Sequence, residues 1–423
     1  MRAIALAPAI LAAVACVHAA STQDLPRAEP EALGFSAERL ARITEIFRAD
    51  AAAGRAPGFV LLIARHGKVG YFEAIGALDP QTKAPMRRDA IFRIYSMTKP
   101  ITQVAAMMLY EEGRITLDEP IAKYLPQFKD VEVGVERPDS AGGPPRLDLV
   151  PAQEPILIHD LMRHTSGITY GTFGNMLVKN AYNDAGLTRG DFDNAEFVDR
   201  LAKLPLAFQP RTTWDYGHST DVLGRLIEVV AGNSLYGFEK ERLLDPLAMR
   251  DTSFYVSDPR KQDRIAEPFK NDRTLGVDFE FGDPRRLGKW ESGGHGMVGT
   301  ASDYARFLQM LLDGGTLDGK RYLGPKTIAY MTADHLGNVI APGPYYLPGP
   351  GYGYGLGFAV RKEQGVSTRT GNPGEYEWGG VGGTYFWVDP REDMFVVFMM
   401  QAPAQRQHYY ALIRDMIYAA LVK

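Results

Sequence analysis

The sequence of 423 residues contains a single cysteine, Cys16, which excludes an internal disulfide, a cysteine-rich zinc site and a dithiol redox motif. It also lacks an excess of basic residues: 47 lysines and arginines stand against 51 aspartates and glutamates, for a net charge of −4. Proteins that bind nucleic acid present a basic surface, so we expect no nucleic-acid partner. Beyond residue 17 no apolar run is long enough to cross a bilayer, which predicts no stable membrane span. The remaining composition, 45% hydrophobic and 23% charged, is typical of a folded globular protein.

Residues 1–20 have the pattern of a secretory signal peptide. Arg2 gives a short basic start, the run 3–17 is apolar and uncharged, and small residues then occupy the −3 and −1 positions of a cleavage site. The sequence therefore predicts a secreted or periplasmic protein. A lipoprotein cleaved before Cys16 is the weaker alternative, because the residue at −3 of such a site is usually larger than the alanine found here.

Strand-like patterns occur at both ends of the chain, and helical patterns lie in the middle. The apolar β-type runs are 59–64, 69–75, 384–388 and 394–400. The first two flank a glycine turn typical of a hairpin. Ser36 begins a predicted helix, and the apolar face of 409–421 predicts another at the C-terminus. The stretch 131–150, rich in proline, glycine and charge, is predicted to be an exposed loop.

The economical arrangement joins the two ends of the chain in one sheet. We therefore expect an α+β fold, with an antiparallel sheet flanked by helices and a mostly helical second lobe. In this division residues 21–95 and 290–423 form the sheet lobe, and residues 96–289 form the helical lobe. A cleft between two such lobes is a usual place for an active site.

One nucleophile signature is present, the tetrad S-x-x-K at residues 96–99, and Ser96 is the only serine with a lysine three positions later. Positions i and i+3 share a helix face, so the Lys99 nitrogen can reach the Ser96 hydroxyl. Pro100 fits the first turn of a helix and places the helix start near Ser96, where the partial positive charge would stabilise an oxyanion. Taken alone, the tetrad is also compatible with a capping serine and a solvated lysine.

Other blocks occur in a fixed order along the chain. They are 95–100 (Y-S-M-T-K-P), 161–167 (L-M-R-H-T-S-G), 214–218 (W-D-Y-G-H), 221–224 (D-V-L-G), 245–249 (D-P-L-A-M) and 378–384 (W-G-G-V-G-G-T). Together they resemble the serine β-lactamase and penicillin-binding superfamily, in particular the class C β-lactamases and their esterase relatives, the family VIII carboxylesterases. The resemblance runs from about residue 36 to the C-terminus.

The resemblance implies a role for each matching residue. Ser96 aligns with the nucleophile, Lys99 with the lysine that activates it, and Tyr216 with the tyrosine that carries protons to and from the leaving group. Val381 aligns with the residue whose backbone N–H completes an oxyanion hole beside the N–H of Ser96. Whether Lys99 or Tyr216 is the base of the acylation step stays open, because the two groups are coupled.

The sequence departs from the family pattern at two places that bear on substrate. The family's Y-x-N motif ends here in His218, which either contacts substrate or Lys99, or serves packing. The K-T-G motif of β-lactamases is replaced by Trp378, Gly379 and Gly380. Without that lysine, a substrate carboxylate loses a charge-assisted bond, and Trp378 offers an apolar wall instead. These departures favour neutral esters over β-lactams.

Several further side chains are weaker candidates. The family makes the 164–167 segment, which begins with His164, a structural turn. His295 lies in a glycine-rich stretch, 292–296, that lines the same cleft in the family. Arg361 and Arg369 are expected to be solvated charges, with recognition of an acid group as the alternative.

The sequence thus predicts a serine hydrolase that cleaves small carboxylic esters through an acyl-enzyme on Ser96, without cofactor or metal. A small-molecule ester is the expected partner, and the oligomeric state is not indicated. Three alternatives remain: a β-lactamase or D,D-peptidase, a D-aminopeptidase-type amide hydrolase on the same residues, and a non-catalytic penicillin-binding-like sensor. The absence of the K-T-G lysine argues against a β-lactamase or D,D-peptidase, and the presence of Tyr216 argues against a sensor.

Overall fold

The computed structural model describes residues 24–140, 142–270, 272–274, 277–278 and 281–423. The predicted signal peptide, 1–20, lies outside the described residues, and so does Cys16. Within those described ranges, no helix combines the length and the apolar character that crossing a bilayer requires.

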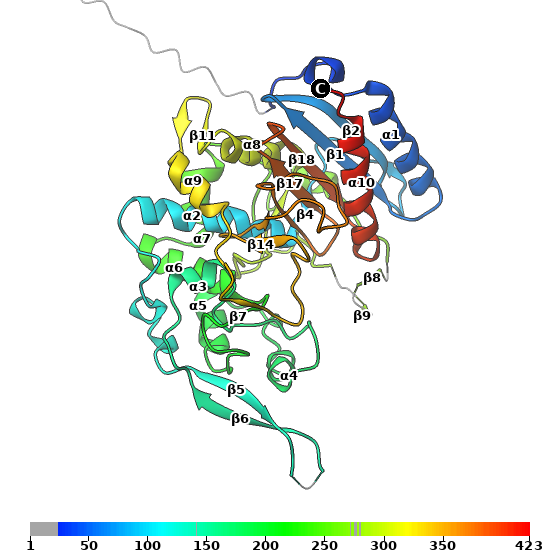
Figure 1. Ribbon diagram of the computed structural model, residues 1–423. Coiled ribbons are helices and arrows are strands. Elements are labelled where there is room, and N and C mark those ends of the chain that lie inside the picture. Colours follow the sequence, from blue (N-terminus) through cyan, green and yellow to red (C-terminus); the bar gives the residue numbers. More distant parts are fainter. Residues whose placement is uncertain (1–23, 141, 271, 275–276, 279–280) are drawn as a thin grey trace, which may run out of the picture.

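An antiparallel sheet of eight strands forms one half of the molecule, in the order β14-β15-β16-β17-β18-β1-β2-β3 (Figure 1). Its strands are β1 (Gly58–Arg65), β2 (Lys68–Asp79), β3 (Ala84–Pro85), β14 (Tyr352–Tyr354), β15 (Ala359–Arg361), β16 (Tyr376–Gly379), β17 (Tyr385–Asp389) and β18 (Met394–Met400). The two ends of the chain meet where β1 pairs with β18. His66 and Gly67 join β1 to β2 with φ values of 53° and 70°, which suit the twist of the two strands and confirm the predicted hairpin.

Alternate side chains of β1 enter two different cores. Phe59 and Leu61 pack beneath α1 (Ala37–Ala52) and α10 (Arg406–Ala420), which lie side by side on one face of the sheet (Figure 1). Val60 and Leu62 point to the opposite face, where α8 (Ala301–Leu312) covers them. Because both faces are buried, β1 is apolar from Gly58 to Ala64 instead of alternating with polar residues, and only its last residue, Arg65, is charged. Each such buried side chain contributes about 1.5–3 kcal/mol.

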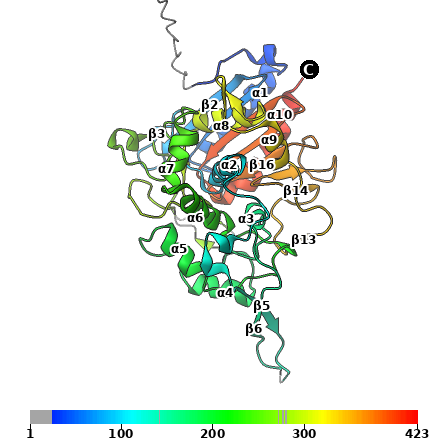
Figure 2. The same ribbon diagram turned by 90° about the vertical axis from the view of Figure 1, so that its left-hand side faces the viewer.

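The helical part of the molecule is built around α2. Its helices are α2 (Thr98–Glu111), α3 (Ile158–Met162), α4 (Leu177–Asp184), α5 (Asn194–Leu201), α6 (Ser219–Ala231) and α7 (Leu235–Glu239). The last residue of α9 (Pro325–Met331) accepts a backbone hydrogen bond from Leu356, just after β14. α2 packs against α6 and α7, and its N-terminal turn packs against β16 of the sheet. Figure 2 shows α2 near the centre of the molecule. The start of α2, where Ser96 lies, is therefore the point at which the sheet and the helices meet.

Short two-stranded pairs complete the fold. They are β4 (Phe92–Arg93) with β10 (Val298–Gly299), β5 (Glu132–Arg137) with β6 (Arg146–Pro151), β7 (Thr213–Trp214) with β13 (Ala341–Pro342), β8 (Arg273–Thr274) with β9 (Val277–Asp278), and β11 (Thr316–Leu317) with β12 (Lys320–Arg321). The prediction of a loop at 131–150 is wrong, because β5 and β6 form a hairpin that projects from the body (Figure 1). Glycine and proline are confined to the tip of this hairpin and to single positions in its strands, and Val133 of β5 is buried.

Candidate active site

Ser96 lies on a sharp turn between a short strand and a helix. β4 leads into a 3-10 turn, Tyr95–Met97, and α2 begins directly after it, so the predicted helix start is confirmed. Tyr95 has a φ of 45°, a left-handed conformation that is unfavourable for a residue with a side chain and is held by its surroundings. Ser96 is partly exposed, whereas Lys99 is buried. The candidate nucleophile is therefore accessible at the positive end of α2.

The Lys99 ammonium is surrounded by oxygen acceptors and by the rings of Tyr170 and Tyr216. Its nitrogen lies 3.4 Å from Ser96 Oγ, 3.3 Å from the Tyr170 hydroxyl and 2.8 Å from the Gly294 carbonyl. It also lies 4.5 Å from the ring centroid of Tyr216. In the described part of the chain no aspartate or glutamate forms an ion pair with Lys99. The structure thus brings the three predicted residues, Ser96, Lys99 and Tyr216, together.

Tyr216 is held by residues from several elements. It lies two residues after the end of β7 and is 6% exposed. Its ring is 5.3 Å from that of Tyr170 and 4.9 Å from that of His164. Its hydroxyl oxygen accepts a hydrogen bond from the indole Nε1 of Trp378, at 3.2 Å. Trp378 is therefore a hydrogen-bond donor to Tyr216, and its role as an apolar wall for substrate stays a prediction.

The turn 380–383, between β16 and β17, carries Val381 beside the segment that leads to Ser96. A Cβ atom on Gly380 would lie 2.5 Å from the Ile94 carbonyl oxygen, so only glycine permits this approach. The Tyr410 hydroxyl donates to the Gly380 carbonyl at 3.0 Å and fixes the turn from the side of α10. The paired oxyanion role of the Ser96 and Val381 amides remains a prediction. Gly379, the last residue of β16, is partly exposed.

His218 occupies the N-cap position of α6 and points into the protein. Its Nδ1 lies 2.9 Å from Asp221 Oδ2, and its ring meets that of Tyr170 edge to face at 4.3 Å. Among the described residues His218 and Lys99 share no hydrogen bond. Of the alternatives left open by the sequence, packing and the bond to Asp221 are therefore seen, and contact with substrate stays a prediction.

His164 is fully buried among aromatic rings. Its ring lies 4.9 Å from that of Tyr216 and 5.6 Å from that of Tyr354, and neither of its nitrogens has a hydrogen-bond partner in the described structure. Burial lowers the pKa of His164 well below its usual range, and the charge of Lys99 acts in the same direction. This placement fits the structural role predicted for the 164–167 segment. Across the described ranges, no three His, Cys, Asp or Glu side chains gather as metal ligands.

Sequence reasoning missed Tyr170, which contacts Lys99 directly. Its hydroxyl accepts from the Lys99 ammonium, and burial, followed by the charge of Asp221, raises the pKa of Tyr170 well above its usual range. The hydroxyl therefore keeps its proton at neutral pH. Tyr170 lies just after the 164–167 segment in the sequence, which could have suggested a place at the site. The spacing of the residues, however, does not indicate a contact with Lys99.

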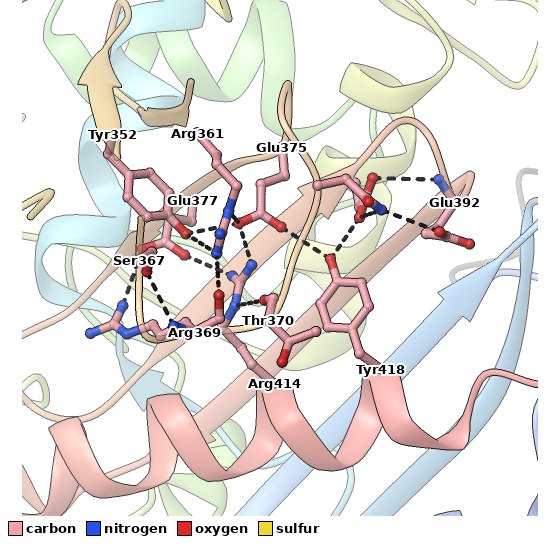
Figure 3. A network of polar contacts seen from close by, with 12 residues as sticks. Tyr352, Arg361, Ser367, Arg369, Thr370, Glu375, Glu377, Glu392, Arg414 and Tyr418 are labelled. Carbon is pink, nitrogen blue, oxygen red and sulfur yellow. Dashed lines mark hydrogen bonds and ion pairs between the residues drawn. The ribbon is translucent and has the colours of Figure 1, made fainter. Parts of the chain in front are cut away.

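The expectation that Arg361 is solvated is wrong. Its guanidinium is buried and pairs with Glu375 at 2.7 Å, inside a polar network that joins β14, β15 and β16 to α10 (Figure 3). Arg414, on α10, pairs with both Glu375 and Glu377 in the same network. Arg369 lies at its margin and contacts Glu377 at 3.3 Å. Both arginines named by the sequence are thus engaged by protein carboxylates.

Comparisons with known proteins identify the family of this chain. The Beta-lactamase family model matches residues 43–417. Protein Rv1367c of Mycobacterium tuberculosis (strain ATCC 25618 / H37Rv) is 34% identical over 360 residues, covering 82% of this chain and 86% of that protein. Esterase EstB of Burkholderia gladioli is 30% identical over 415 residues, covering 92% and 98%.

Among solved structures, EstCE1, a hydrolase with promiscuous acyltransferase activity, superposes with a TM-score of 0.74 at 29% identity, covering 90% of this chain and 99% of that one. This similarity and the observed sheet confirm the predicted α+β, β-lactamase-like fold. The family resemblance read from the ordered sequence blocks is confirmed as well. The chain belongs to the Beta-lactamase family.

Proposed function

We propose that this protein is a serine carboxylesterase that cleaves small esters through an acyl-enzyme on Ser96. The observation that carries the proposal is the contact of Lys99 with both Ser96 and the Tyr216 ring. At this site Trp378 takes the place of the lysine of the K-T-G motif. Esterase EstB and the hydrolase EstCE1 are similar to this chain along nearly its whole length, which supports ester hydrolysis.

In the acylation step Ser96 Oγ attacks the ester carbonyl carbon. Its proton passes to the coupled pair of Lys99 and Tyr216, which must enter this step short of one proton, as ammonium and phenolate or as amine and phenol. The carbonyl oxygen becomes an oxyanion that the Ser96 and Val381 amides would stabilise. The carbon–oxygen bond to the alcohol then breaks, and Tyr216 returns a proton to the departing alkoxide. The products are a free alcohol and an acyl group bound to Ser96.

Deacylation repeats the sequence with water as the nucleophile. Water loses a proton to the Lys99 and Tyr216 pair and attacks the acyl carbon, and Ser96 Oγ leaves with a proton from the same pair. The carboxylic acid is released and Ser96 is restored. Dividing the reaction into two steps replaces one high barrier by two lower ones.

The surroundings of Tyr216 favour a neutral, apolar acyl group. The Tyr216 ring contacts the rings of Tyr170, Phe173 and Trp378. Tyr354 extends this aromatic cluster through its contact with Trp378. Arg361, a cation considered as a carboxylate anchor, is already paired with Glu375. A β-lactam carboxylate would therefore meet indole and glycine where the family's lysine binds it.

Initial rates of the purified protein on p-nitrophenyl butyrate and on a chromogenic cephalosporin test the proposal. We expect faster turnover of the ester and loss of that activity in Ser96→Ala. Ser302→Ala, on α8 and outside the site, is the matched control and keeps wild-type rates. Faster turnover of the cephalosporin would contradict the esterase proposal and favour a β-lactamase that uses the same catalytic residues.

We also propose that the protein is exported, on the basis of the charge and apolarity of residues 1–20. Expression of the full chain, cell fractionation and N-terminal sequencing of the product test this. A mature protein that starts close to residue 20 in the exported fraction is expected. An unprocessed chain in the cytoplasmic fraction would contradict export, and a lipid on Cys16 would replace cleavage near residue 20 by the lipoprotein alternative.

A further inference from the structure

The glycine-rich segment 292–296 supplies the shortest hydrogen bond of the Lys99 ammonium. The Gly294 carbonyl accepts from Lys99 at 2.8 Å, whereas the Ser96 and Tyr170 oxygens lie at 3.4 and 3.3 Å. A buried ammonium depends strongly on such acceptors, because burial removes the water that would otherwise solvate it. The position of the Gly294 carbonyl therefore sets where the Lys99 nitrogen lies relative to Ser96.

Asp221, on α6, holds this segment in place. Its Oδ1 accepts from the Ser292 hydroxyl and, at 3.1 Å, from the backbone N–H of Gly294, while its Oδ2 accepts from His218 Nδ1 at 2.9 Å. The carboxylate is 2% exposed. Burial alone would raise the pKa of Asp221, but the hydrogen bonds from His218 and Ser292 and the nearby histidines lower it below its usual value. Asp221 is therefore a buried anion.

The same peptide unit connects Asp221 to Lys99. The carbonyl of Gly294 accepts from Lys99, and the N–H of the same peptide, on His295, donates to Ser292 Oγ at 3.1 Å. Ser292 then donates its own proton to Asp221. An unbroken chain of hydrogen bonds thus runs from a carboxylate through a hydroxyl and a peptide to the ammonium, and bonds in such chains polarise one another.

Two further observations show that the approach is built into the chain. A Cβ atom on Gly294 would lie 2.8 Å from Asp221 Oδ2, so a side chain at this position would displace the carboxylate. His295 Nδ1 lies 3.0 Å from Ser292 Oγ, and burial lowers the pKa of His295 to about 4, with Lys99 acting in the same direction and Asp221 against it. His295 is therefore neutral at pH 7 and donates to Ser292, whose single proton is directed at Asp221.

We propose that Asp221 is a positioning residue for the esterase reaction: through Ser292 and the Gly294–His295 peptide it holds the carbonyl that keeps Lys99 beside Ser96. The inference rests on the proposed function and adds to it. Asp221 does not touch the reacting atoms in this arrangement, and its negative charge offsets the buried ammonium through two intervening groups. Neither the tetrad at 96–99 nor the other blocks assign it this part.

Asp221→Asn is the first test, with steady-state kinetics on p-nitrophenyl butyrate. The amide keeps the shape of the side chain, but it removes the negative charge and turns an N–H₂ group toward at least one of the three donors, so the carboxylate that ends the chain is lost. We expect kcat to fall by about 30-fold, the size typical of one lost hydrogen bond to a charged group, while KM changes by less than about threefold. If the substitution only lowers the fraction of folded protein, the melting temperature falls, but kcat stays unchanged when it is calculated per active site titrated with a covalent Ser96 probe.

Ser292→Ala breaks the chain at its next link and completes a double-mutant cycle. Because Asp221 and Ser292 act along one route, the double variant is expected to be no more than about threefold slower than Asp221→Asn alone.

Glu239→Gln is the matched control. Glu239 is a second buried carboxyl that is linked to the glycine-rich segment 292–296. Its Oε1 atom is hydrogen-bonded to the Thr102 hydroxyl, and that hydroxyl donates to the Gly293 carbonyl. Burial raises the pKa of Glu239 well above its usual value, so the amide replaces a neutral acid and kcat should stay within about twofold.

The rate at which a fluorophosphonate probe labels Ser96 gives a readout that does not depend on the substrate. If the wild type hydrolyses the ester but Asp221→Asn retains its kcat and labelling rate, the positioning role is wrong and the esterase stands. If the wild type hydrolyses no ester, the proposed function is wrong, and slower labelling in Asp221→Asn than in Glu239→Gln still supports the positioning role. Multiplicative losses in the double variant would show that Asp221 and Ser292 act separately, which also overturns it.

Discussion

The indole nitrogen of Trp378 donates a hydrogen bond to the hydroxyl oxygen of Tyr216 across 3.2 Å, between β16 and the segment that follows β7. In the β-lactamases that the sequence resembles, the matching position is a lysine. The neutral indole donor bonds the tyrosine oxygen here but does not supply the charge that binds a substrate carboxylate. The same substitution thus accounts both for the placement of Tyr216 and for the expected preference for neutral esters.

Trp378→Phe is expected to lower kcat for p-nitrophenyl butyrate by about tenfold. Phenylalanine keeps an aromatic wall but has no N–H, and a single hydrogen bond contributes about 0.5–1.5 kcal/mol. Trp387→Phe, on β17 of the same sheet, is the control, because the Trp387 indole nitrogen has no partner among the described residues. Equal kcat losses in the two variants would contradict a specific role of the Trp378 donor.

Tyr170→Phe removes one of the three oxygen acceptors of the Lys99 ammonium. We expect kcat to fall by about tenfold with little change in KM, because the lost bond involves a buried charge and not the substrate. Tyr354→Phe serves as the comparison, since the buried Tyr354 hydroxyl has no partner in the described structure. Stopped-flow measurement of the p-nitrophenol burst separates acylation from deacylation. A wild-type kcat in Tyr170→Phe would show that the hydroxyl is a bystander.

Local spacing predicted what depends on neighbours in the chain. The contact between Ser96 and Lys99 follows from the i, i+3 geometry at the start of a helix, and the glycine turn of the β1–β2 hairpin follows from backbone conformation. The ordered blocks placed Tyr216 and Trp378 at the same site. Their mutual hydrogen bond was not predicted, because the pattern compares residue types and says nothing about which atoms meet.

Contacts between distant segments account for what the sequence did not predict. The burial of Arg361 depends on Glu375, the residue before β16, and the position of Tyr170 depends on contacts with Lys99. Tyr170 also packs against the rings of Tyr216 and His218. Charged residues are normally exposed unless paired, and no local pattern reveals the partner. The β5–β6 hairpin was missed because the proline and glycine at its tip dominate the composition of the window.

His164→Asn tests the pH dependence that a buried neutral histidine gives to stability. In the folded protein the pKa of His164 lies well below 6.5, so between pH 7 and 5.5 the unfolded state binds the proton and the folded state does not. Stability therefore falls as the pH falls through about 6.5, by about 1 kcal/mol over this interval for one such group. Asparagine tolerates the φ of 58° at this position and does not titrate. Urea unfolding at both pH values should show a smaller loss in His164→Asn; an equal loss would show that His164 is protonated in the folded protein.

Arg414→Ala should destabilise the protein far more than Arg369→Ala, although both arginines contact Glu377. Arg414 is fully buried and also pairs with Glu375, so its removal leaves two carboxylates buried without their main cation, which typically costs about 3–5 kcal/mol. The Arg369 side chain is 24% exposed, and a partly solvated pair of this kind contributes about 1 kcal/mol or less. Urea denaturation at pH 7 measures both changes. Because the network joins α10 to β16, which ends beside Trp378, a large loss for Arg414→Ala would show that the C-terminal helix is needed to hold that strand, whereas equal small losses would mean that water replaces the guanidinium.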